Sequence, residues 1–462
     1  MDTVSVVRLD WISHFKVKIK LKYKEKRIAV LGCGKSGIAA SRLALSEGAN
    51  VKLFDTGYSD QLQESVLALN AEGISVALGQ EGICKDPASY DFVIMSPGIS
   101  LEWEIVQPFI KSGINILGEI EFAFGLCDSE IIGVTGTNGK TTTVELIGKI
   151  LEECGEKVAI GGNHGRPFAD IINDNISYST IVLEVSSFQL ETIKNFSPHI
   201  AVWTNFAPDH LDRYRSLEDY RNAKMQIFIN QGDEDWAIVN GIDKPKNLKA
   251  KTVTFSAYNE FNDYYLSDSK IISDGEVIVD QSMTKLRGLH NAENLMVAVA
   301  VAKIRGYENK QILNAALDYK APPHRCELIA ESQGVQFIND SKATNIHAMV
   351  SAINSFKGHD IVLVAGGKDK GISYVEASET VSKNVNSVVL FGENKFQISE
   401  DWKALSKCHL VEDLNEALRV ALDLVDESGV VLFSPGTSSF DMFEGYEDRG
   451  NAFKNSVIKL IT

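Results

Sequence analysis

The sequence predicts an α/β protein of about three domains. Short apolar runs typical of buried strands alternate with helical stretches, and this alternation starts anew twice along the chain. Strands that alternate with helices are typical of parallel sheets. The length of 462 residues agrees, because a domain contains roughly 150 residues.

The first cycle predicts an N-terminal domain over residues 27–118. Arg27–Leu31 has the composition of a buried strand, and Gly32-x-Gly34-x-x-Gly37 and a helix follow it. Further strands are expected at Val51–Asp55 and Asp91–Ser96. A glycine-rich turn between strand and helix, with an acid at the next strand end, is typical of a Rossmann-like domain that binds a nucleotide diphosphate. A tight turn without a ligand is the alternative.

The second cycle predicts a central domain over residues 119–321. Strands are expected at Glu130–Thr135, Thr180–Glu184 and His199–Thr204. Near residues 250–285 the pattern changes to short alternating runs, which indicate a small antiparallel piece. The central domain should therefore contain a mostly parallel sheet.

A phosphate-binding loop is predicted after the first central strand. The segment from Gly133 to Thr142 departs from strict P-loop spacing, but it keeps the lysine and the hydroxyl of that motif at Lys140 and Thr141. In such a loop the lysine contacts the β- and γ-phosphates and the hydroxyl reaches Mg²⁺. The domain is therefore expected to be P-loop ATPase-like.

Acidic residues follow two other central strands. Glu184 ends an apolar run, where a carboxylate is well placed as a Mg²⁺ ligand, although a solvated strand-end acid is the alternative. The segment Asn205-Phe-Ala-Pro-Asp209-His210-Leu-Asp212-Arg213-Tyr214 combines acids with a histidine. That composition suits metal and phosphate chemistry.

Lys224 is predicted on the apolar face of a short helix. Ser216-Leu-Glu-Asp219 resembles a capping box, so the helix should begin near Leu217 and turn Tyr220, Lys224 and Phe228 to one side. From this spacing alone, a snorkelling lysine with its amine in water is favoured. The alternative is a buried amine with a lowered pKa, which can react with CO₂ and become an anionic ligand for a second Mg²⁺.

The third cycle predicts a Rossmann-like C-terminal domain over residues 322–462. Ala321-Pro322-Pro323 is the linker and hinge candidate, because consecutive prolines stiffen a connection. Strands are expected at Val335–Asn339, Asp360–Ala365, Ser387–Phe391 and Val430–Ser434. The loops 339–345, 366–371 and 434–439 follow strand ends, where open α/β sheets bind ligands, and their lysines and hydroxyls suit an acidic substrate. Each of them could also be a plain loop.

Composition narrows the class of protein further. The formal net charge of −16 argues against broad binding to nucleic acid or anionic membrane. The six cysteines are scattered without a C-x-x-C pair, which indicates reduced thiols in a cytoplasmic protein. The sequence contains no run of about 18 apolar residues, so we expect no membrane span. Residues 1–26 are rich in lysine without the features of a signal peptide, and we expect a loosely ordered extension.

With these motifs the chain resembles the Mur ligases of bacterial cell-wall synthesis. The loop Gly136–Thr142 looks like their shared ATP motif, which folylpolyglutamate synthases also have. Four further segments are similar to the D-glutamate-adding members of the family: Glu184–Leu190, Asp209–Tyr214, Pro323–Glu327 and Asn339–Asn345. The resemblance covers residues 27–462.

The resemblance implies an ATP-dependent ligase. Its substrates would be UDP-N-acetylmuramoyl-L-alanine and D-glutamate, joined through an acyl phosphate with release of ADP and phosphate. It also implies two Mg²⁺ ions and a carbamylated Lys224, which reverses the preference for a snorkelling lysine. We expect a cytoplasmic monomer.

The family pattern carries roles to individual positions. Catalytic roles go to Lys140, Glu184, His210 and Lys224, and metal ligation goes to Thr141, Glu184, His210 and Lys224. ATP would contact Gly136, Thr137, Asn138, Gly139, Lys140, Thr141, Thr142, Asn294, Arg325 and Asp340. The UDP substrate would contact Ser36, Gly37, Asp55, Thr56, Gly98, Asn163 and His210, and D-glutamate would contact Lys342, Thr344, Lys370 and Ser439.

The sequence departs from the family pattern at two places that matter for the site. Lys368 and Lys370 both flank Asp369, so either lysine could meet the glutamate, and Tyr446 stands where a phenylalanine is expected. Two other functional classes remain open at this point. An NAD-dependent oxidoreductase would use the first glycine-rich loop but leaves the Lys140 loop without a role, and a non-catalytic nucleotide-binding module would not need Lys224.

Overall fold

The computed structural model describes residues 22–174, 176–209, 213–286, 288–319, 323–371, 373–405 and 407–461. His210, most of the predicted extension and the hinge residues Ala321 and Pro322 lie outside this range. The chain forms two compact units, Met1–Leu126 with Ile172–Asp174, and Cys127–Ile171 with Asn175–Thr462. Each unit is described by itself.

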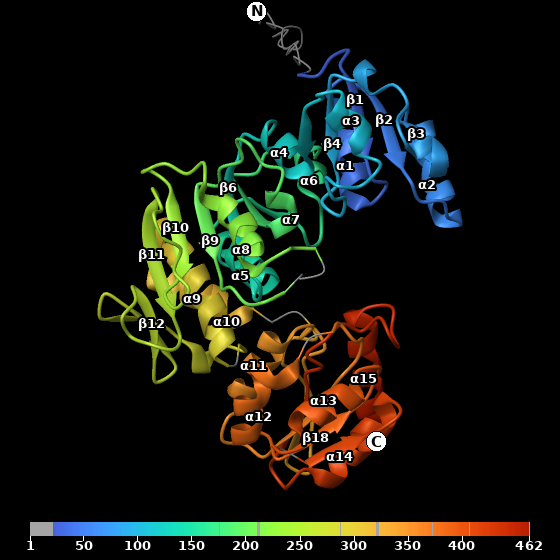
Figure 1. Ribbon diagram of the computed structural model, residues 1–462. Coiled ribbons are helices and arrows are strands. Elements are labelled where there is room, and N and C mark those ends of the chain that lie inside the picture. Colours follow the sequence, from blue (N-terminus) through green and yellow to red (C-terminus); the bar gives the residue numbers. More distant parts are fainter. Residues whose placement is uncertain are drawn as a thin grey trace, which may run out of the picture. The chain divides into compact units, whose positions relative to one another are not determined.

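The first unit contains a parallel five-stranded sheet in the order β3-β2-β1-β4-β5 (Figure 1). The strands are β1 (Arg27–Leu31), β2 (Asn50–Asp55), β3 (Ser75–Leu78), β4 (Phe92–Met95) and β5 (Ile116–Gly118). The helices are α1 (Lys35–Ser46), α2 (Asp60–Ala71), α3 (Gln107–Lys111) and α4 (Glu119–Phe124). This strand order is that of a Rossmann-like sheet, which confirms the predicted class. The sequence did not reveal β3 and β5.

Part of the N-terminal extension packs onto the first unit. The ring of Tyr23 lies 5.5 Å from that of Phe92 and 5.3 Å from that of Phe122, measured between ring centroids. The backbone N–H of Tyr23 donates a hydrogen bond to the carbonyl of Glu47 at 3.1 Å. For residues 22–26 the expectation of a loosely ordered segment is therefore wrong, because an aromatic cluster fixes them.

The second unit begins with a nine-stranded sheet in the order β14-β13-β12-β11-β10-β9-β6-β8-β7. The strands are β6 (Glu130–Thr135), β7 (Val158–Gly162), β8 (Thr180–Glu184), β9 (Ile200–Trp203), β10 (Trp236–Asn240), β11 (Lys251–Ser256), β12 (Tyr264–Ser267), β13 (Lys270–Ser273) and β14 (Glu276–Asp280). The helices are α5 (Lys140–Glu153), α6 (Phe168–Ile172), α7 (Ser187–Leu190), α8 (Leu217–Met225), α9 (Leu289–Ile304) and α10 (Asn309–Asp318). Helices α5, α9 and α10 share one buried apolar cluster with this sheet.

The sheet is parallel from β7 to β12 and antiparallel from β12 to β14. A mostly parallel sheet with a small antiparallel piece was the expectation, and it is confirmed. The piece begins later than the pattern indicated, since β11 still runs parallel to β10.

The second unit continues with a six-stranded sheet in the order β15-β16-β20-β17-β18-β19. Its strands are β15 (Glu327–Ser332), β16 (Val335–Asn339), β17 (Ile361–Ala365), β18 (Ser387–Leu390), β19 (Lys407–Leu410) and β20 (Val430–Phe433). Its helices are α11 (Ile346–Ser355), α12 (Ser378–Asn384), α13 (Lys395–Trp402), α14 (Leu414–Leu424) and α15 (Tyr446–Ile461). Two separate apolar clusters, one with α11 to α13 and one with α14 and α15, show that helices cover both faces of this sheet. Among the described strands of this sheet, only β15 is antiparallel to its neighbour.

The predicted fold class is confirmed, while the domain limits 27–118, 119–321 and 322–462 stay predictions.

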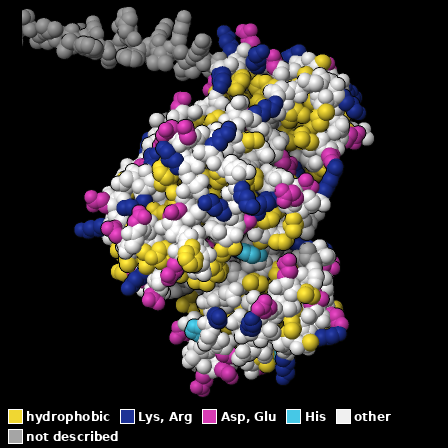
Figure 2. Space-filling model, turned by 60° about the vertical axis from the view of Figure 1, so that its left-hand side comes forward, with side chains coloured by type: hydrophobic (Ala, Val, Ile, Leu, Met, Phe, Trp, Pro, Cys, Tyr) yellow, Lys and Arg dark blue, Asp and Glu magenta, His cyan; other side chains and the backbone are white. Residues whose placement is uncertain are grey.

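Charged groups of both signs occur on the face of the molecule that Figure 2 presents. Figure 2 shows lysine and arginine side chains interspersed with acidic ones on the face that it presents. Among the helices within the described residues, none is both long and apolar enough to cross a membrane.

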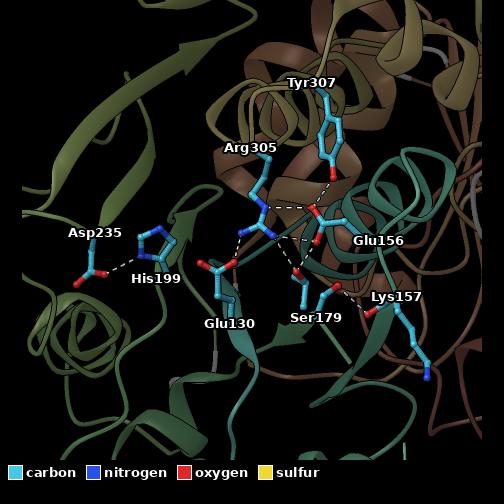
Figure 3. A network of polar contacts seen from close by, with 9 residues as sticks. Glu130, Glu156, Lys157, Ser179, His199, Asp235, Arg305 and Tyr307 are labelled. Carbon is cyan, nitrogen blue, oxygen red and sulfur yellow. Dashed lines mark hydrogen bonds and ion pairs between the residues drawn. The ribbon is translucent and has the colours of Figure 1, made fainter. Parts of the chain in front are cut away.

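An ionic network joins the end of α9 to the start of the central strands (Figure 3). Arg305 donates hydrogen bonds to Glu156 at 3.1 and 3.0 Å and forms an ion pair with Glu130, the first residue of β6. Tyr307 donates its hydroxyl to Glu156 at 2.9 Å. Burial raises the pKa of Glu156, but the hydrogen bonds from Thr180, Arg305 and Tyr307 outweigh it and hold that pKa below its usual value.

We predict that Arg305→Ala lowers the free energy of unfolding by about 2 kcal/mol, because it leaves the largely buried Glu156 carboxylate without its charge partner. The lowered pKa of Glu156 means that this contribution is present at neutral pH and is lost as the pH falls through that pKa. The difference between the two proteins should therefore shrink in acid. Urea unfolding at several pH values measures it.

Lys383→Ala is the matched control for this prediction. Lys383 pairs with Glu379 on the surface, with side chains 66% and 79% exposed, so its loss should change stability by less than about 0.5 kcal/mol. Equal destabilisation by the two variants would contradict the role of the network.

Candidate active site

A cavity of ≈ 470 Å³ lies in the second unit, at the C-terminal ends of the central strands. Loops of both sheets and the N-terminal turn of α9 line it. Thirteen of the predicted site residues are among the lining: Thr137, Asn138, Gly139, Lys140, Thr141, Thr142, Asn163, Glu184, Asn294, Arg325, Asp340, Lys342 and Thr344. Segments far apart in the sequence therefore converge on one space.

The predicted phosphate loop connects β6 to α5. Gly139 caps α5 with a φ of +83°, a left-handed conformation that favours glycine. Asn205 accepts a hydrogen bond from the Asn138 backbone N–H at 2.9 Å, and Thr204 donates its hydroxyl to the Asn138 carbonyl at 2.7 Å. The loop is therefore held from the end of β9, and the N-terminus of α5 is available to an anion.

Two lysine amines meet at one carbonyl oxygen of this loop. Lys140 Nζ donates to the carbonyl of Gly136 at 3.0 Å, and Lys224 Nζ donates to the same oxygen at 2.8 Å. Burial, followed by the nearby charge of Lys140, lowers the pKa of Lys224 well below its usual value. The pKa of Lys140 is lowered too, mainly by burial. Because two positive charges this close repel each other, protonation of both lysines at the same time is disfavoured. Lys224, whose pKa is lowered further, is the better candidate for the neutral, nucleophilic amine.

The position of Lys224 contradicts the snorkelling interpretation. Its side chain is only 2% exposed, and Nζ lies 4.6 Å from the ring centroid of Tyr220. The predicted cap of the helix is present, since Ser216 accepts a hydrogen bond from the Asp219 N–H at 3.1 Å. Tyr220 and Phe228 are buried as expected, but Leu217 is 40% exposed because it stands at the first turn. The amine is buried and donates to the Gly136 carbonyl instead of to bulk water, which is why snorkelling fails.

Glu184 offers an ionised carboxylate beside the loop. Its Oε2 accepts a hydrogen bond from the Thr141 hydroxyl at 2.7 Å, and its Oε1 accepts one from the Asn163 amide at 2.8 Å. Burial raises the pKa of Glu184, but the charge of Lys140 and these two hydrogen bonds outweigh it, so the pKa lies below its usual value. The carboxylate therefore stays charged at neutral pH.

The oxygen donors here fit Mg²⁺. This ion prefers a few protein oxygens and completes its shell with water and phosphate oxygens, which a Thr141 hydroxyl and a Glu184 carboxylate would permit. In the described part of the chain no three His, Cys, Asp and Glu side chains cluster as a metal site of their own. His210, the other predicted ligand, lies outside the described residues.

Asn294, Asp340 and Arg325 also line the cavity. Asn294 accepts a hydrogen bond from the Thr143 hydroxyl at 3.1 Å. Asp340 accepts hydrogen bonds from the Ser434 hydroxyl at 2.8 Å and the Cys326 N–H at 3.2 Å, and burial raises its pKa to about 7. Arg325 lines the same cavity.

Of the four residues predicted to hold D-glutamate, Lys342 and Thr344 line the cavity, whereas Lys370 and Ser439 are not among the lining residues. Lys342 lines the cavity, and its amine lies 3.5 Å from the ring centroid of Tyr446. Burial and the charge of Arg325 lower the pKa of Lys342 to about 8. Lys370 donates to the carbonyl of Thr344 at 3.3 Å, which links it to this group.

Ser439 and Lys368 stand apart from the cavity. Ser439 is buried and is not among the residues that line the cavity. Lys368 forms an ion pair with Glu393 at 2.7 Å. Of the two lysines that the sequence could not separate, Lys370 is therefore the one that contacts the Thr344 loop.

The residues predicted for the UDP substrate lie mostly in the first unit. Gly37 packs so closely that an added Cβ would lie 1.9 Å from the Gly32 carbonyl oxygen. The Asp55 carboxylate accepts hydrogen bonds from the N–H groups of Cys33 and Gly57, both at 2.7 Å. Asp55 therefore braces the glycine-rich loop. Ser36, Thr56 and Gly98 flank the C-terminal ends of β1, β2 and β4, whereas Asn163 belongs to the second unit.

Sequence reasoning assigned no role to several residues that complete the site. Asn345 caps α11 and donates to Asn138 Oδ1 and to Asp209 Oδ2, both at 3.3 Å. His347 lies 3.0 Å from the Asn138 amide, between ring and amide nitrogens. An asparagine directly before a predicted helix is a detectable signal of a cap. The tie to Asn138 joins segments 207 residues apart, and no local pattern reveals it.

We predict that Gly139→Ala weakens ATP binding at least about tenfold. The new Cβ would force a left-handed backbone angle on alanine and would stand 2.4 Å from Asn294 Oδ1, so the loop must shift. Titration calorimetry with ATP and Mg²⁺ measures the dissociation constant.

Gly155→Ala is the matched control at the other end of α5. Gly155 has a φ of +96°, and no atom lies within 4 Å of an added Cβ there. It should cost about 1 kcal/mol of stability and leave ATP binding unchanged. If both variants bound ATP equally well, the loop would not be the phosphate site.

Comparisons with known proteins agree with this geometry. Residues 26–118 match the family model described as Mur ligase MurD-like, N-terminal domain. Residues 134–302 match the Mur ligase middle domain, and residues 324–436 match the Mur ligase glutamate ligase domain.

Similar proteins extend over nearly the whole chain. A UDP-N-acetylmuramoylalanine–D-glutamate ligase of Caldanaerobacter subterraneus subsp. tengcongensis is 38% identical over 460 residues, covering 95% of this chain and 100% of the relative. The ligase of the same name from Pelotomaculum thermopropionicum is 36% identical over 452 residues, covering 95% and 98%. The solved MurF ligase of Thermotoga maritima in complex with ADP shares the fold, with a TM-score of 0.60, 17% identity and coverage of 95% and 96%. The chain therefore belongs to the Mur ligase family.

Proposed function

We propose that this protein is the ATP-dependent ligase that adds D-glutamate to UDP-N-acetylmuramoyl-L-alanine in peptidoglycan precursor synthesis. The observation that carries this proposal is the phosphate loop, which lines the cavity together with Glu184 and whose Gly136 carbonyl accepts a hydrogen bond from the buried Lys224. The names of the relatives support the choice of substrates. A cytoplasmic location and a monomeric state remain predictions.

In the first step the terminal carboxylate of the muramoyl-alanine attacks the γ-phosphorus of ATP. An acyl phosphate forms and ADP leaves. The main barrier is the repulsion between the carboxylate and the triphosphate, and a cation aimed at the transferring phosphoryl group offsets it. Lys140, which now donates to loop carbonyls, is the residue to turn toward the phosphates.

Metal ions would supply the remaining positive charge. Thr141 and Glu184 would hold one Mg²⁺, and a carbamylated Lys224 with His210 would hold another, neutralising charge on the phosphates. Carbamate formation needs a neutral amine, which the buried position of Lys224 beside Lys140 favours. The carbamate would also place an anion beside Lys140 that can balance its charge.

In the second step the amine of D-glutamate attacks the acyl phosphate and phosphate leaves. Lys342, Thr344, Lys370 and Ser439 are proposed to hold the carboxylates of D-glutamate, and a lysine with a lowered pKa still binds such anions near neutral pH. Water would hydrolyse the acyl phosphate, so closure about residues 321–323 should precede the chemistry. Ser36, Gly37, Asp55, Thr56, Gly98 and Asn163 remain our assignment for the UDP-sugar.

The assay for this function is phosphate release in the presence of ATP, Mg²⁺ and UDP-N-acetylmuramoyl-L-alanine. We predict that D-glutamate stimulates the release, and that Lys370→Ala raises the KM for D-glutamate at least about tenfold because a carboxylate loses its cation. The KM for ATP should stay within about twofold.

Lys368→Ala serves as the control because its amine is paired with Glu393. It should leave the KM for D-glutamate nearly unchanged. An absence of stimulation by D-glutamate in the native protein would refute the proposed substrate, whereas a reversed order of the two variants would refute only the choice of lysine.

We predict that Lys224→Ala lowers kcat at least about a hundredfold while ATP still binds. Millimolar formate or acetate should restore part of the activity, because a small carboxylate can occupy the space of the carbamate. Lys224→Arg keeps a positive charge but cannot be carbamylated, so it should be inactive as well. Activity of the arginine variant near the native level would show that the residue acts as a cation.

A further inference from the structure

The cavity has two sides that differ in chemistry. The phosphate loop follows β6, and the sheet order places β8 and β7 on one side of it and β9, β10 and β11 on the other. On the first side lie Glu184 and Asn163. On the second side the lining continues with the apolar side chains of Ile242, Phe255, Tyr258 and Val297. Strands stand about 4.8 Å apart, so β10 and β11 are about 10–15 Å from the phosphate loop.

That distance and composition suit the base of a nucleotide whose phosphates lie at the loop. Planar ligands bind between apolar faces, and a few polar groups read their edges. Tyr258 is 51% exposed, belongs to the loop after β11 and lines the cavity, and an aromatic side chain there can stack on a base.

Glu293 is a carboxylate on this apolar side of the cavity. It lies in the first turns of α9, is 8% exposed and lines the cavity. Its Oε1 accepts hydrogen bonds from the Asn240 amide at 3.2 Å and from the Ala257 N–H at 3.3 Å. Its Oε2 has no hydrogen bond within the described residues and is not fully buried, so this oxygen is available to a ligand in the cavity that Glu293 lines.

Other polar groups on this side are less able to discriminate between bases. Asp243 is the other carboxylate there, and both of its oxygens are engaged, one by Arg221 at 2.5 Å and one by the Trp203 indole at 3.1 Å. Asn291 and Asn294 carry amides, which can offer either a donor or an acceptor to a ligand. A carboxylate oxygen, by contrast, accepts from an N–H and repels a carbonyl oxygen.

We propose that Glu293 selects ATP by accepting a hydrogen bond from the 6-amino group of adenine through Oε2. Hypoxanthine and guanine present a carbonyl oxygen at that position, and the carboxylate would repel it. The inference rests on the proposed function, since it assigns a base contact to the same ATP site. Burial raises the pKa of Glu293 to about 7, and an amino donor would favour its ionised form.

Titration calorimetry of the full chain with Mg²⁺ and ATP, ITP or purine riboside triphosphate tests the inference. The native protein should bind ATP at least about tenfold more tightly than either analogue, because ITP carries the 6-oxo group and purine riboside triphosphate carries no 6-substituent. The last comparison needs no variant, so it holds even if a substitution at this buried position unfolds the protein.

Glu293→Gln should reduce the preference for ATP over ITP at least about tenfold, since an amide can donate to the 6-oxo group. Asp243→Asn is the matched control, and it should leave the ratio unchanged because both oxygens of Asp243 point to other partners. An equal affinity for ATP and purine riboside triphosphate, or an unchanged ratio in Glu293→Gln, would overturn the inference and leave the proposed function standing. Binding of none of the three triphosphates would overturn both.

Discussion

The site depends on the carbonyl oxygen of Gly136, which accepts hydrogen bonds from two lysines at once. The two bonds keep the amines within about 6 Å of each other in a buried place, where like charges repel strongly. The repulsion is relieved if the Lys224 amine stays neutral, or if carbamylation turns it into an anion. Either outcome leaves Lys140 as the cation for phosphate, with Glu184 as the fixed negative charge nearby. The proposed chemistry follows from this electrostatic arrangement more than from any one residue type.

Local patterns in the sequence were sufficient for the frame of the fold. The strands β1, β6 and β8 have the predicted bounds, because each is an uninterrupted apolar run beside a glycine loop or a strand-end acid. By contrast, β3 and β5 are short strands at the two edges of their sheet. Each contains too few apolar residues for its pattern to be distinguished from the apolar face of a helix. The antiparallel β15 was missed because none of its residues is fully buried and a register shift interrupts its pairing with β16, so no regular apolar pattern marks it.

The same distinction applies to the site. A loop such as Gly136–Thr142 carries its chemistry in consecutive residues, so its role could be predicted from the sequence. The buried amine of Lys224 contacts the Tyr220 ring and the Gly136 carbonyl, and Gly136 lies 88 residues away in the sequence. The residue spacing of the helix alone therefore favoured a solvated amine. Asn345, His347 and Glu293 acquire their positions from contacts between distant segments. The resemblance to a family supplied what local patterns could not for Lys224, but not for Glu293.

The packing of Tyr23 sets a practical limit for work on this protein. Its ring packs on Phe92 and Phe122, so a shortened chain that starts after Tyr23 would expose more of these two aromatic side chains of the first unit. Such a protein would be prone to aggregate during purification. A tag or a fusion partner placed ahead of residue 22 keeps the packing of Tyr23 on Phe92 and Phe122 intact. A truncation of the N-terminus should therefore not extend beyond residue 22.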